Sequence, residues 1–184
     1  MTELSTDRLL LRQWRDSDRD PFAALNADPA VMEHFPAPQT REQSDALIDR
    51  NLPLIDERGW GLWALEVRET GEFIGFTGLS VPSFEAHFMP AVEIGWRLAK
   101  GAWGNGYASE AARAALAYGF GPAGLDEIVS FTATTNVPSQ RVMQRIGMVH
   151  DEAGDFDHPR LDDGHRLKRH VLYRIDRAQW ESTR

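Results

Sequence analysis

The stretch Trp103-Gly104-Asn105-Gly106-Tyr107-Ala108, followed by Ser109-Glu110-Ala111-Ala112, decides the fold of this 184-residue chain. A strand-like run, Val92 to Leu98, precedes it, and a helical pattern begins within it and continues to about Phe120. Two glycines at the start of a helix let the backbone turn tightly and direct free N–H groups at one point, where the helix dipole adds partial positive charge. The pattern therefore predicts a site for an anion such as a phosphate or a pyrophosphate.

The loop lacks the lysine and the Ser/Thr of a P-loop, so it is not suited to nucleotide hydrolysis. As a dinucleotide fingerprint it has Ser109 in place of the third glycine, although Asp126 lies about where a ribose-binding acid would be. Several strand-like segments precede the loop, and too few residues follow it to complete a doubly wound sheet. The loop alone is compatible with two interpretations. It could bind the diphosphate of a cofactor that is held and not hydrolysed, or it could be a plain strand–turn–helix connection.

A second motif follows the next strand-like run, Glu127 to Ala133. It reads Asn136-Val137-Pro138-Ser139-Gln140-Arg141-Val142-Met143-Gln144-Arg145-Ile146-Gly147-Met148. Pro138 is tolerated at an early helical position, where its missing N–H costs little, and Gly147 is suited to end the helix. The pattern predicts a helix over residues 137–146, with three apolar side chains on one face: Val142, Met143 and Ile146.

Together the two motifs resemble those of the GNAT N-acetyltransferases, and within them the RimJ/RimL-like branch. That branch writes its pyrophosphate loop as Trp-Gly-x-Gly-Tyr-Ala and its later motif as Asn-x-x-Ser-x-x-Val-Met-x-x-x-Gly. The opening of the chain, Thr6 to Arg12 with Asp28 to Met32 after it, is similar to the same branch. The resemblance extends from residue 5 to about residue 175 and rests on three ordered motifs.

The resemblance implies an α+β GNAT fold. Such a fold has a mixed, mostly antiparallel central sheet of about seven strands flanked by helices, and one parallel βαβ step forms the acetyl-CoA cleft. The length favours a single domain over residues 1–184. Periodicity and turn residues place strands at 7–14, 60–68, 72–81, 91–98, 126–133, 149–153 and 168–175, and helices at 16–27, 40–57, 104–119 and 137–146.

Composition narrows the function. The net charge of −8 argues against a general surface for nucleic acid or for an anionic membrane, and fits a cationic amine acceptor or simple solubility. The absence of cysteine excludes disulfides, thiolate zinc sites and a cysteine acyl-enzyme, and the six histidines have no metal-site spacing, so no metal is expected. The sequence has no apolar run of membrane length and no signal-like start, so we expect a cytoplasmic enzyme, monomer or homodimer.

Glu93 is the leading candidate for a general base. In a strand over residues 91–98, Glu93 and Arg97 share one face, and a carboxylate in a central strand is costly to bury unless it is paired. Glu93 could accept a proton from an incoming ammonium group, directly or through water. The alternatives are a salt bridge with a cation such as Arg97, or exposure on a sheet face.

The resemblance also implies the residues that bind the cofactor. Residues 103–108 would hold the pyrophosphate through backbone N–H groups, and the strand before them would line the acetyl and pantetheine groups, with a backbone N–H polarising the acetyl oxygen. The wider superfamily has Gln or Arg where this chain has Trp103, so Trp103 is expected to pack rather than to bind phosphate. The implied cofactor residues are Ile94, Gly95, Trp96, Leu98, Trp103, Gly104, Asn105, Gly106, Tyr107, Ala108 and Asn136.

The proton donor for the leaving thiolate is less obvious. Many relatives in the wider superfamily have a tyrosine where this chain has Met143, which cannot donate a proton. Ser139 lies one turn earlier on the same helix face and could hydrogen-bond the sulfur, or could bond back to the helix backbone. Asn136 could hold the pantetheine amide, cap the helix, or do both. Tyr173, on a late strand, is a weaker candidate acid.

These observations predict an enzyme that transfers acetyl from acetyl-CoA to a primary amine, either a protein or peptide N-terminal amine or that of a small molecule, by direct attack within a ternary complex. One alternative is a small-molecule acetyltransferase acting on an aminoglycoside or polyamine. Another is a CoA-binding sensor or interaction module without catalysis, which Met143 favours and which Glu93 and Ser139 oppose. Two apolar loops, residues 83–90 and 33–36, could line the acceptor pocket, form a dimer contact or fold back on the core.

Overall fold

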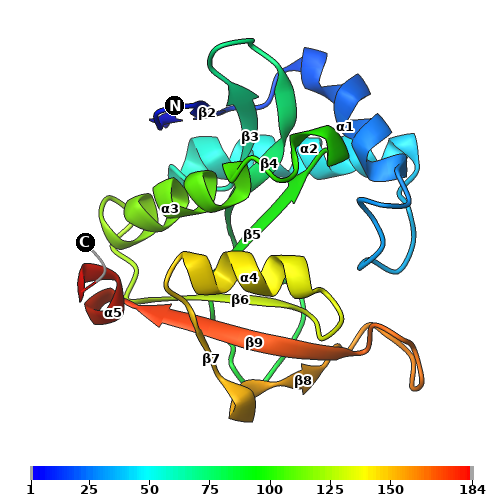
Figure 1. Ribbon diagram of the computed structural model, residues 1–184, viewed down its shortest axis with the longest axis vertical. Helices are drawn as coiled ribbons and strands as arrows, with labels where there is room; N and C mark the ends of the chain where they lie inside the picture. Colours follow the sequence, from blue (N-terminus) through cyan, green and yellow to red (C-terminus); the bar gives the residue numbers. More distant parts are fainter. Residues whose placement is uncertain (1, 183–184) are drawn as a thin grey trace.

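The computed structural model describes residues 2–182 and contains one mixed sheet (Figure 1). The strand order is β1-β2-β3-β4-β5-β6-β9-β7, and β8 pairs with β9. Every neighbouring pair is antiparallel except β5 with β6. The strands are β1 (Leu4–Ser5), β2 (Leu9–Arg12), β3 (Leu62–Val67), β4 (Phe73–Ser80), β5 (Glu93–Leu98), β6 (Glu127–Ala133), β7 (Val149–His150), β8 (Phe156–Asp157) and β9 (Arg169–Asp176).

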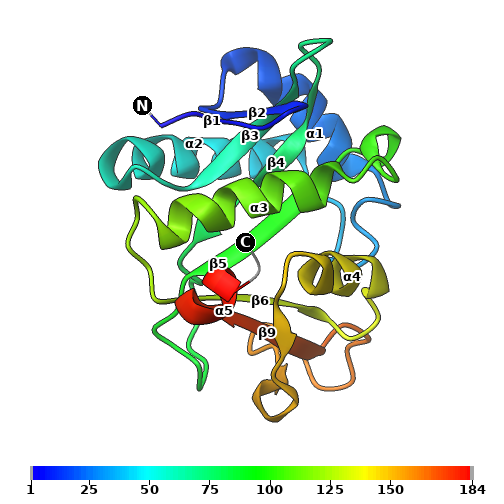
Figure 2. The ribbon, with the colours of Figure 1, turned by 60° about the vertical axis from the view of Figure 1, so that its left-hand side comes forward.

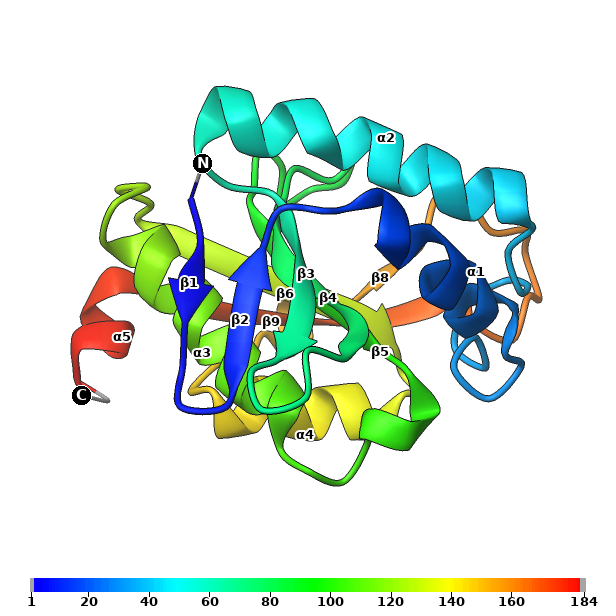
Figure 3. The same cartoon turned by 90° about the horizontal axis from the view of Figure 1, so that it is seen from above.

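Helices cover both faces of the sheet. Seen from above, α1 and α2 lie on one side of the strands, and α3 and α4 lie on the other (Figure 3). Helices α3 and α4 pack beside each other (Figure 2). Within residues 2–182, none of the helices is long and apolar enough to cross a membrane. The helices are α1 (Arg19–Ala27), α2 (Arg41–Arg58), α3 (Tyr107–Phe120), α4 (Val137–Arg145) and α5 (Arg177–Ser182).

Most of the predicted elements form at or close to their predicted positions. Helix α2 begins with a capping box, in which Thr40 accepts from the Gln43 N–H and Gln43 accepts from the Thr40 N–H. It ends at Gly59, whose φ of 78° is left-handed. The expectation of about seven strands was too low, because β1 and β8 have two residues each and carry no periodic pattern. Helix α5 was also missed, and the strand expected at 149–153 is only two residues long.

The sheet splits between its two parallel strands. Strands β5 and β6 pair only at Glu93 and Val129, and the Ser130 hydroxyl then donates to the Ile94 carbonyl at 2.9 Å. In Figure 1, β4 and β5 belong to the upper half of the molecule, and β6 and β9 belong to the lower half. Because each half is completed by antiparallel neighbours, the edges of β5 and β6 can separate beyond this point without exposing a whole strand.

Two apolar clusters pack against the sheet. The main core spans both halves, with side chains from β2 to β6, from β9 and from α1 to α5. A smaller cluster under the lower half includes Phe88, Val129, Phe156 and Leu172, with Phe84 packed against it. The apolar loop at residues 83–90 therefore folds back on the core, which was one of its three predicted roles.

Candidate active site

A cavity of about 850 Å³ occupies the split between β5 and β6. Both strands line it, together with the loop before α3, the first turns of α4, and two loops at residues 30–36 and 158–170. Twelve of the thirteen predicted site residues line this cavity, and Asn105 does not. The twelve are Glu93, Ile94, Gly95, Trp96, Leu98, Trp103, Gly104, Gly106, Tyr107, Ala108, Asn136 and Ser139.

The glycine loop has the geometry of an anion cradle. Gly104 and Gly106 have φ values of 78° and 79°, in the left-handed region that favours glycine. A Cβ at Gly104 would meet no atom within 4 Å, so the space above the backbone is open. The N–H groups of Gly104, Gly106 and Tyr107 have no acceptor among residues 2–182. Unpaired N–H groups at a helix start are what a pyrophosphate would satisfy, so the loop fits this group.

Arg8 holds this loop from outside the cavity. Its Nη1 donates to the Asn105 carbonyl at 2.9 Å, and its guanidinium lies 4.8 Å from the centre of the Tyr107 ring. Its Nε donates to Glu110 Oε2 at 2.7 Å. Asn105 thus contributes to loop support, with its carbonyl directed towards Arg8. No pattern in the sequence predicts this contact, because Arg8 and Asn105 are 97 residues apart.

Glu110, in the first turn of α3, is neutralised by the same arginine. A carboxylate beside an anion site would repel the ligand unless it were paired. Partial burial acts to raise the pKa of Glu110, but hydrogen bonds from Thr6 and from Arg8 outweigh it and lower the pKa. Glu110 is therefore ionised at neutral pH, and Arg8 compensates its charge.

Trp103 differs from its predicted role. Trp103 was expected to pack rather than to bind phosphate, but the residue is 48% exposed and is not part of the core. Its indole N–H donates to the Leu98 carbonyl at 2.9 Å, which fastens the loop to the end of β5. With that donor occupied, the indole does not offer an N–H to a phosphate.

Glu93 lies where the strands separate. Its carboxyl makes no hydrogen bond or ion pair with any residue in 2–182, and the predicted alternative of a salt bridge with Arg97 does not form. Burial raises the pKa of the Glu93 carboxyl to about 8. A carboxyl group that titrates near pH 8 is suited to exchange a proton with an amine.

Asn136 and Ser139 lie at the start of α4. The Asn136 Oδ1 accepts from the Ser139 N–H at 3.3 Å, and its Nδ2 donates to the Thr132 hydroxyl at 2.9 Å. Asn136 therefore caps the helix, one of its two predicted roles. The Ser139 hydroxyl makes no hydrogen bond within residues 2–182, so the expected alternative, a bond back to the helix backbone, is not present.

Met143 and Tyr173 are both buried, but only Met143 lines the cavity. Its side chain is 1% exposed and belongs to the core. Tyr173 lies outside the cavity lining, stacks on His150 with ring centres 4.9 Å apart, and accepts a hydrogen bond from Gln144 at 3.2 Å. Within the described part of the chain, Ser139 is thus better placed than Tyr173 to meet a group in the cavity.

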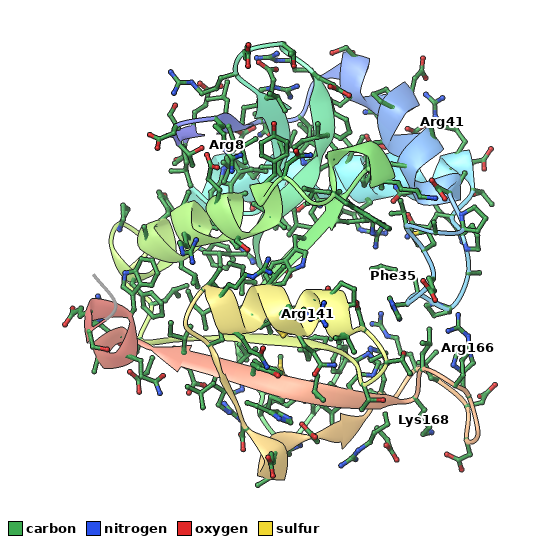
Figure 4. All side chains as sticks on the ribbon, in the orientation of Figure 1. Arg8, Phe35, Arg41, Arg141, Arg166 and Lys168 are labelled. Atoms are coloured by element: carbon green, nitrogen blue, oxygen red, sulfur yellow. The ribbon has the colours of Figure 1, made fainter. Side chains whose placement is uncertain are left out.

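The far end of the cavity is closed by two loops that are distant in sequence. Arg166, in the loop before β9, donates to the Glu33 carbonyl in the loop after α1 at 2.7 Å. Thr135 and His34 approach each other at 3.4 Å on the same side. Figure 4 shows Phe35 and Arg166 on these loops, on the same side of the molecule and beside α4, on which Arg141 is labelled. The loop at residues 33–36 therefore lines the pocket, as one of its predicted roles stated.

Two histidines on the lower wall of this end are neutral at physiological pH. Burial, together with repulsion from Arg160 and from His170 in its protonated form, lowers the pKa of His158 to about 4. Burial also lowers the pKa of His170. The two rings lie 5.0 Å apart. They offer neutral hydrogen-bonding groups and flat surfaces rather than positive charge.

A mixed sheet that splits beside a helix opened by glycines, with a partly buried carboxyl group at the split, defines a transferase of the acyl-CoA-using class. The chain belongs to the GNAT acetyltransferases, because the family described as "Acetyltransferase (GNAT) domain" matches residues 8–149. It is accordingly an acetyl-CoA-dependent acyltransferase. The finer RimJ/RimL-like placement rests on the motifs alone.

Relatives and solved structures agree with this assignment. The protein YkkB of Bacillus subtilis is 37% identical over 80% of this chain and 85% of its own length. FsC-acetyl coenzyme A-N(2)-transacetylase of Aspergillus fumigatus is 31% identical over 96% of this chain and 77% of its own length. The crystal structure of a GNAT-family acetyltransferase from Bacillus anthracis superposes with a TM-score of 0.78 at 25% identity, covering 96% of this chain and 99% of that one.

Proposed function

We propose that the chain acts as one catalytic domain that transfers acetyl from acetyl-CoA to the primary amine of a small molecule or peptide, by direct attack within a ternary complex. One observation carries this proposal: a single cavity connects the glycine loop, Glu93 and the loops at residues 30–36 and 158–170. Donor and acceptor can therefore occupy the site together, which direct attack requires. When bound, acetyl-CoA supplies the activated acetyl group and the leaving thiol.

At the donor end, the chain would bind through backbone groups. The free N–H groups of Gly104, Gly106 and Tyr107 would receive the pyrophosphate, and Arg8 keeps the loop in place. Ile94, Gly95 and Trp96 lie on β5 beside the split, where the backbone groups that β6 does not pair would be open to the pantetheine arm and to the acetyl oxygen. Leu98 and Asn136 would complete the walls of this channel.

At the reacting centre, Glu93 would accept the proton of the ammonium group, directly or through water. An amine must lose this proton to attack, and a carboxyl whose pKa is about 8 lies close to the working pH of such an exchange. Ser139 would donate a hydrogen bond to the sulfur as it leaves, because its hydroxyl is unbonded and lines the same cavity. Neither step needs a covalent intermediate on the protein.

The lining argues against a polycationic acceptor. It contains two carboxylate side chains, Glu33 and Glu93, against four arginines, Arg97, Arg141, Arg145 and Arg160. A polyamine or an aminoglycoside would need several carboxylates to compensate its charges. The lining thus favours an acceptor with one amine, and the RimJ/RimL-like motifs make a peptide N-terminus one such candidate.

Initial-rate measurements test this proposal. Thiol release from acetyl-CoA should depend on an added primary amine, and double-reciprocal plots at several amine concentrations should intersect. Parallel lines would indicate a covalent acetyl-enzyme and contradict direct attack. Amine-independent thiol release would reduce the activity to hydrolysis. Binding is checked separately, because acetyl-CoA should raise the melting temperature and NADH at the same concentration should not.

A further inference from the structure

Arg97 is a buried arginine whose environment the acetyl transfer described above does not explain. It lies on β5, is only 8% exposed, and lines the cavity. Its Nη1 donates to Asn26 Oδ1 at 2.7 Å. The guanidinium lies 4.2 Å from the centre of the Phe35 ring and 5.5 Å from that of Phe76. Arg97 is thus held between two aromatic rings at the wall formed by α1 and the loop that follows it.

No carboxylate compensates this charge. Within residues 2–182, Arg97 forms no salt bridge, and its Nε is buried without a hydrogen-bond partner. Arg12 offers a direct comparison, because it is 2% exposed but is paired with Asp18 and Glu66, each at 2.7 Å. A buried arginine without such a partner is costly, since water no longer solvates the charge.

The two arginines also differ in pKa. Burial lowers the pKa of Arg97 to about 10, so it stays charged at neutral pH. Burial acts in the same direction on Arg12, but hydrogen bonds and charges from Asp18 and Glu66 outweigh it and raise the pKa. The positive charge at Arg97 is therefore present in the cavity wall and is not compensated from within the protein.

The orientation of Arg97 is fixed by a chain of side chains. The Asn26 Nδ2 donates to the Ser44 hydroxyl of α2 at 2.9 Å, which leaves its Oδ1 to face Arg97. Asn26 and Ser44 are both fully buried. Because each partner is itself held, the guanidinium is positioned before any ligand arrives, as in sites that recognise carboxylates.

We infer that Arg97 receives a carboxylate of the amine acceptor, so that the acceptor is an amino acid or a related amine that carries a carboxylate. This inference rests on the proposed function. Glu93 and Arg97 point to the same face of β5, four residues and about 13 Å apart along the strand. The proton acceptor Glu93 and the carboxylate receptor Arg97 thus lie along one wall, and Phe35 from the loop after α1 lies beside Arg97.

The first experiment compares acceptors in matched pairs. L-methionine, L-phenylalanine, L-glutamate and 4-aminobutyrate are each tested beside the corresponding amide, with acetyl-CoA and the full chain. At least one carboxylate should exceed its amide by about tenfold or more in kcat/KM, as expected for a charge-assisted pair. Amides that react as well as every carboxylate would overturn the inference.

The second experiment supplies the missing carboxylate from within the protein. Asn26→Asp is nearly isosteric and would pair with Arg97 as Asp18 pairs with Arg12. The melting temperature should be maintained or rise, and the preference for carboxylate over amide should fall to near one. If Asn26→Asp folds and keeps the full preference, Arg97 is not the receptor.

Substitutions at Arg97 complete the test. Arg97→Met should lose the carboxylate preference, and Arg97→Lys should recover part of it, because an ammonium keeps the charge but not the planar fork. Arg141→Met is the matched control, since Arg141 is an exposed arginine of the same cavity lining, and the preference should be unchanged. A rise in KM for acetyl-CoA alone in Arg97→Met would assign Arg97 to the donor and overturn the inference.

The two proposals fail in different ways. If acetyl-CoA raises the melting temperature but no amine releases thiol, the proposed transfer is wrong. If neutral amines release thiol and no carboxylate is preferred, transfer stands and only the role of Arg97 is wrong. The acetyl-CoA-induced melting shift, measured for every variant, confirms that each one folds with an intact donor site.

Discussion

Arg8 and Glu110 form an ion pair, with Arg8 Nε donating to Glu110 Oε2 at 2.7 Å, although they are 102 residues apart. The pair joins the turn between β1 and β2 to the first turn of α3. It neutralises a carboxylate beside the anion loop and places an arginine where it also holds the Asn105 carbonyl. An N-terminal turn outside the cavity is thereby part of the support for the cofactor loop.

Arg8→Met should weaken acetyl-CoA binding and leave the chemical step nearly intact. The variant releases the loop and leaves Glu110 uncompensated, so we expect Kd for acetyl-CoA to rise by about tenfold, or about 1.4 kcal/mol. Titration calorimetry measures this change. Arg68→Met is the matched control, because Arg68 contacts the carbonyls of Thr6 and Asp7 in the same turn without touching the loop. Equal affinities for all three proteins would contradict a role for Arg8.

Gly106→Ala should reduce both stability and cofactor binding. Gly106 has a φ of 79°, which costs a non-glycine residue about 1–2 kcal/mol. Relief of that strain would turn the N–H groups away from the cavity and diminish the melting shift caused by acetyl-CoA. Gly101→Ala is the control, because a Cβ there meets no atom within 4 Å and its φ is not positive. A full melting shift in Gly106→Ala would show that the loop does not bind the anion.

Glu93→Gln should lower turnover by about 10²–10⁴-fold with little change in acetyl-CoA affinity. In the unsubstituted enzyme kcat/KM should rise with pH up to about 8, because the carboxyl must be ionised to accept a proton. This rise of kcat/KM with pH should disappear or move to another pH range in Glu93→Gln. Glu33→Gln is the control, because it removes the other carboxylate of the cavity lining, and its kcat/KM should still rise with pH up to about 8. Unchanged turnover in Glu93→Gln would assign the proton to water or to the acceptor itself.

The same carboxyl should make folding stability depend on pH. Its pKa in the folded chain is about 8 rather than the ordinary 4.5, so between these values the folded state holds a proton that the unfolded state has released. Stability should therefore fall as pH rises from about 5 to 8, and this component should be absent from Glu93→Gln. Melting temperatures of the two proteins should diverge in favour of Glu93→Gln as pH increases. Parallel curves across this range would exclude a Glu93 whose carboxyl is protonated in the folded chain at neutral pH.

Ser139→Ala should lower kcat by about ten- to a hundredfold, the value of one hydrogen bond to a charged group. The fold should persist, because Asn136 accepts from the backbone N–H of residue 139 rather than from its hydroxyl. Tyr173→Phe is the control, since its hydroxyl faces Gln144 outside the cavity, and should turn over at the normal rate. The opposite pattern would move the proton donor to Tyr173. Many relatives in the wider superfamily have a tyrosine at position 143, but Met143→Tyr should not restore the turnover that Ser139→Ala loses. Met143 is fully buried, and a larger side chain would overpack the core.

Local signals in the sequence predicted most of the fold. The capping box of Thr40 and Gln43, the left-handed glycine at position 59 and the periodic runs in α3, α4 and β6 each act within a few residues, so they can be read in order along the chain. The elements that were missed, β1, β8 and α5, are held by their neighbours. A strand of two residues is too short to show an alternation of apolar and polar side chains, so only its pairing with a neighbouring strand defines it.

The candidate site likewise combines features set by local sequence with features set by contacts between distant residues. The sequence by itself determined the anion loop, the carboxylate in β5 and the capped helix α4, because glycine conformation, strand alternation and helix capping are local properties. Only the tertiary structure decided that Glu93 remains unpaired, that Asn26 takes the guanidinium of Arg97 and that Arg8 supports the loop. These contacts join residues far apart in the sequence: 71 residues separate Asn26 from Arg97, and 97 separate Arg8 from Asn105. Burial, which also depends on the tertiary structure, then shifts the pKa values of Glu93 and Arg97.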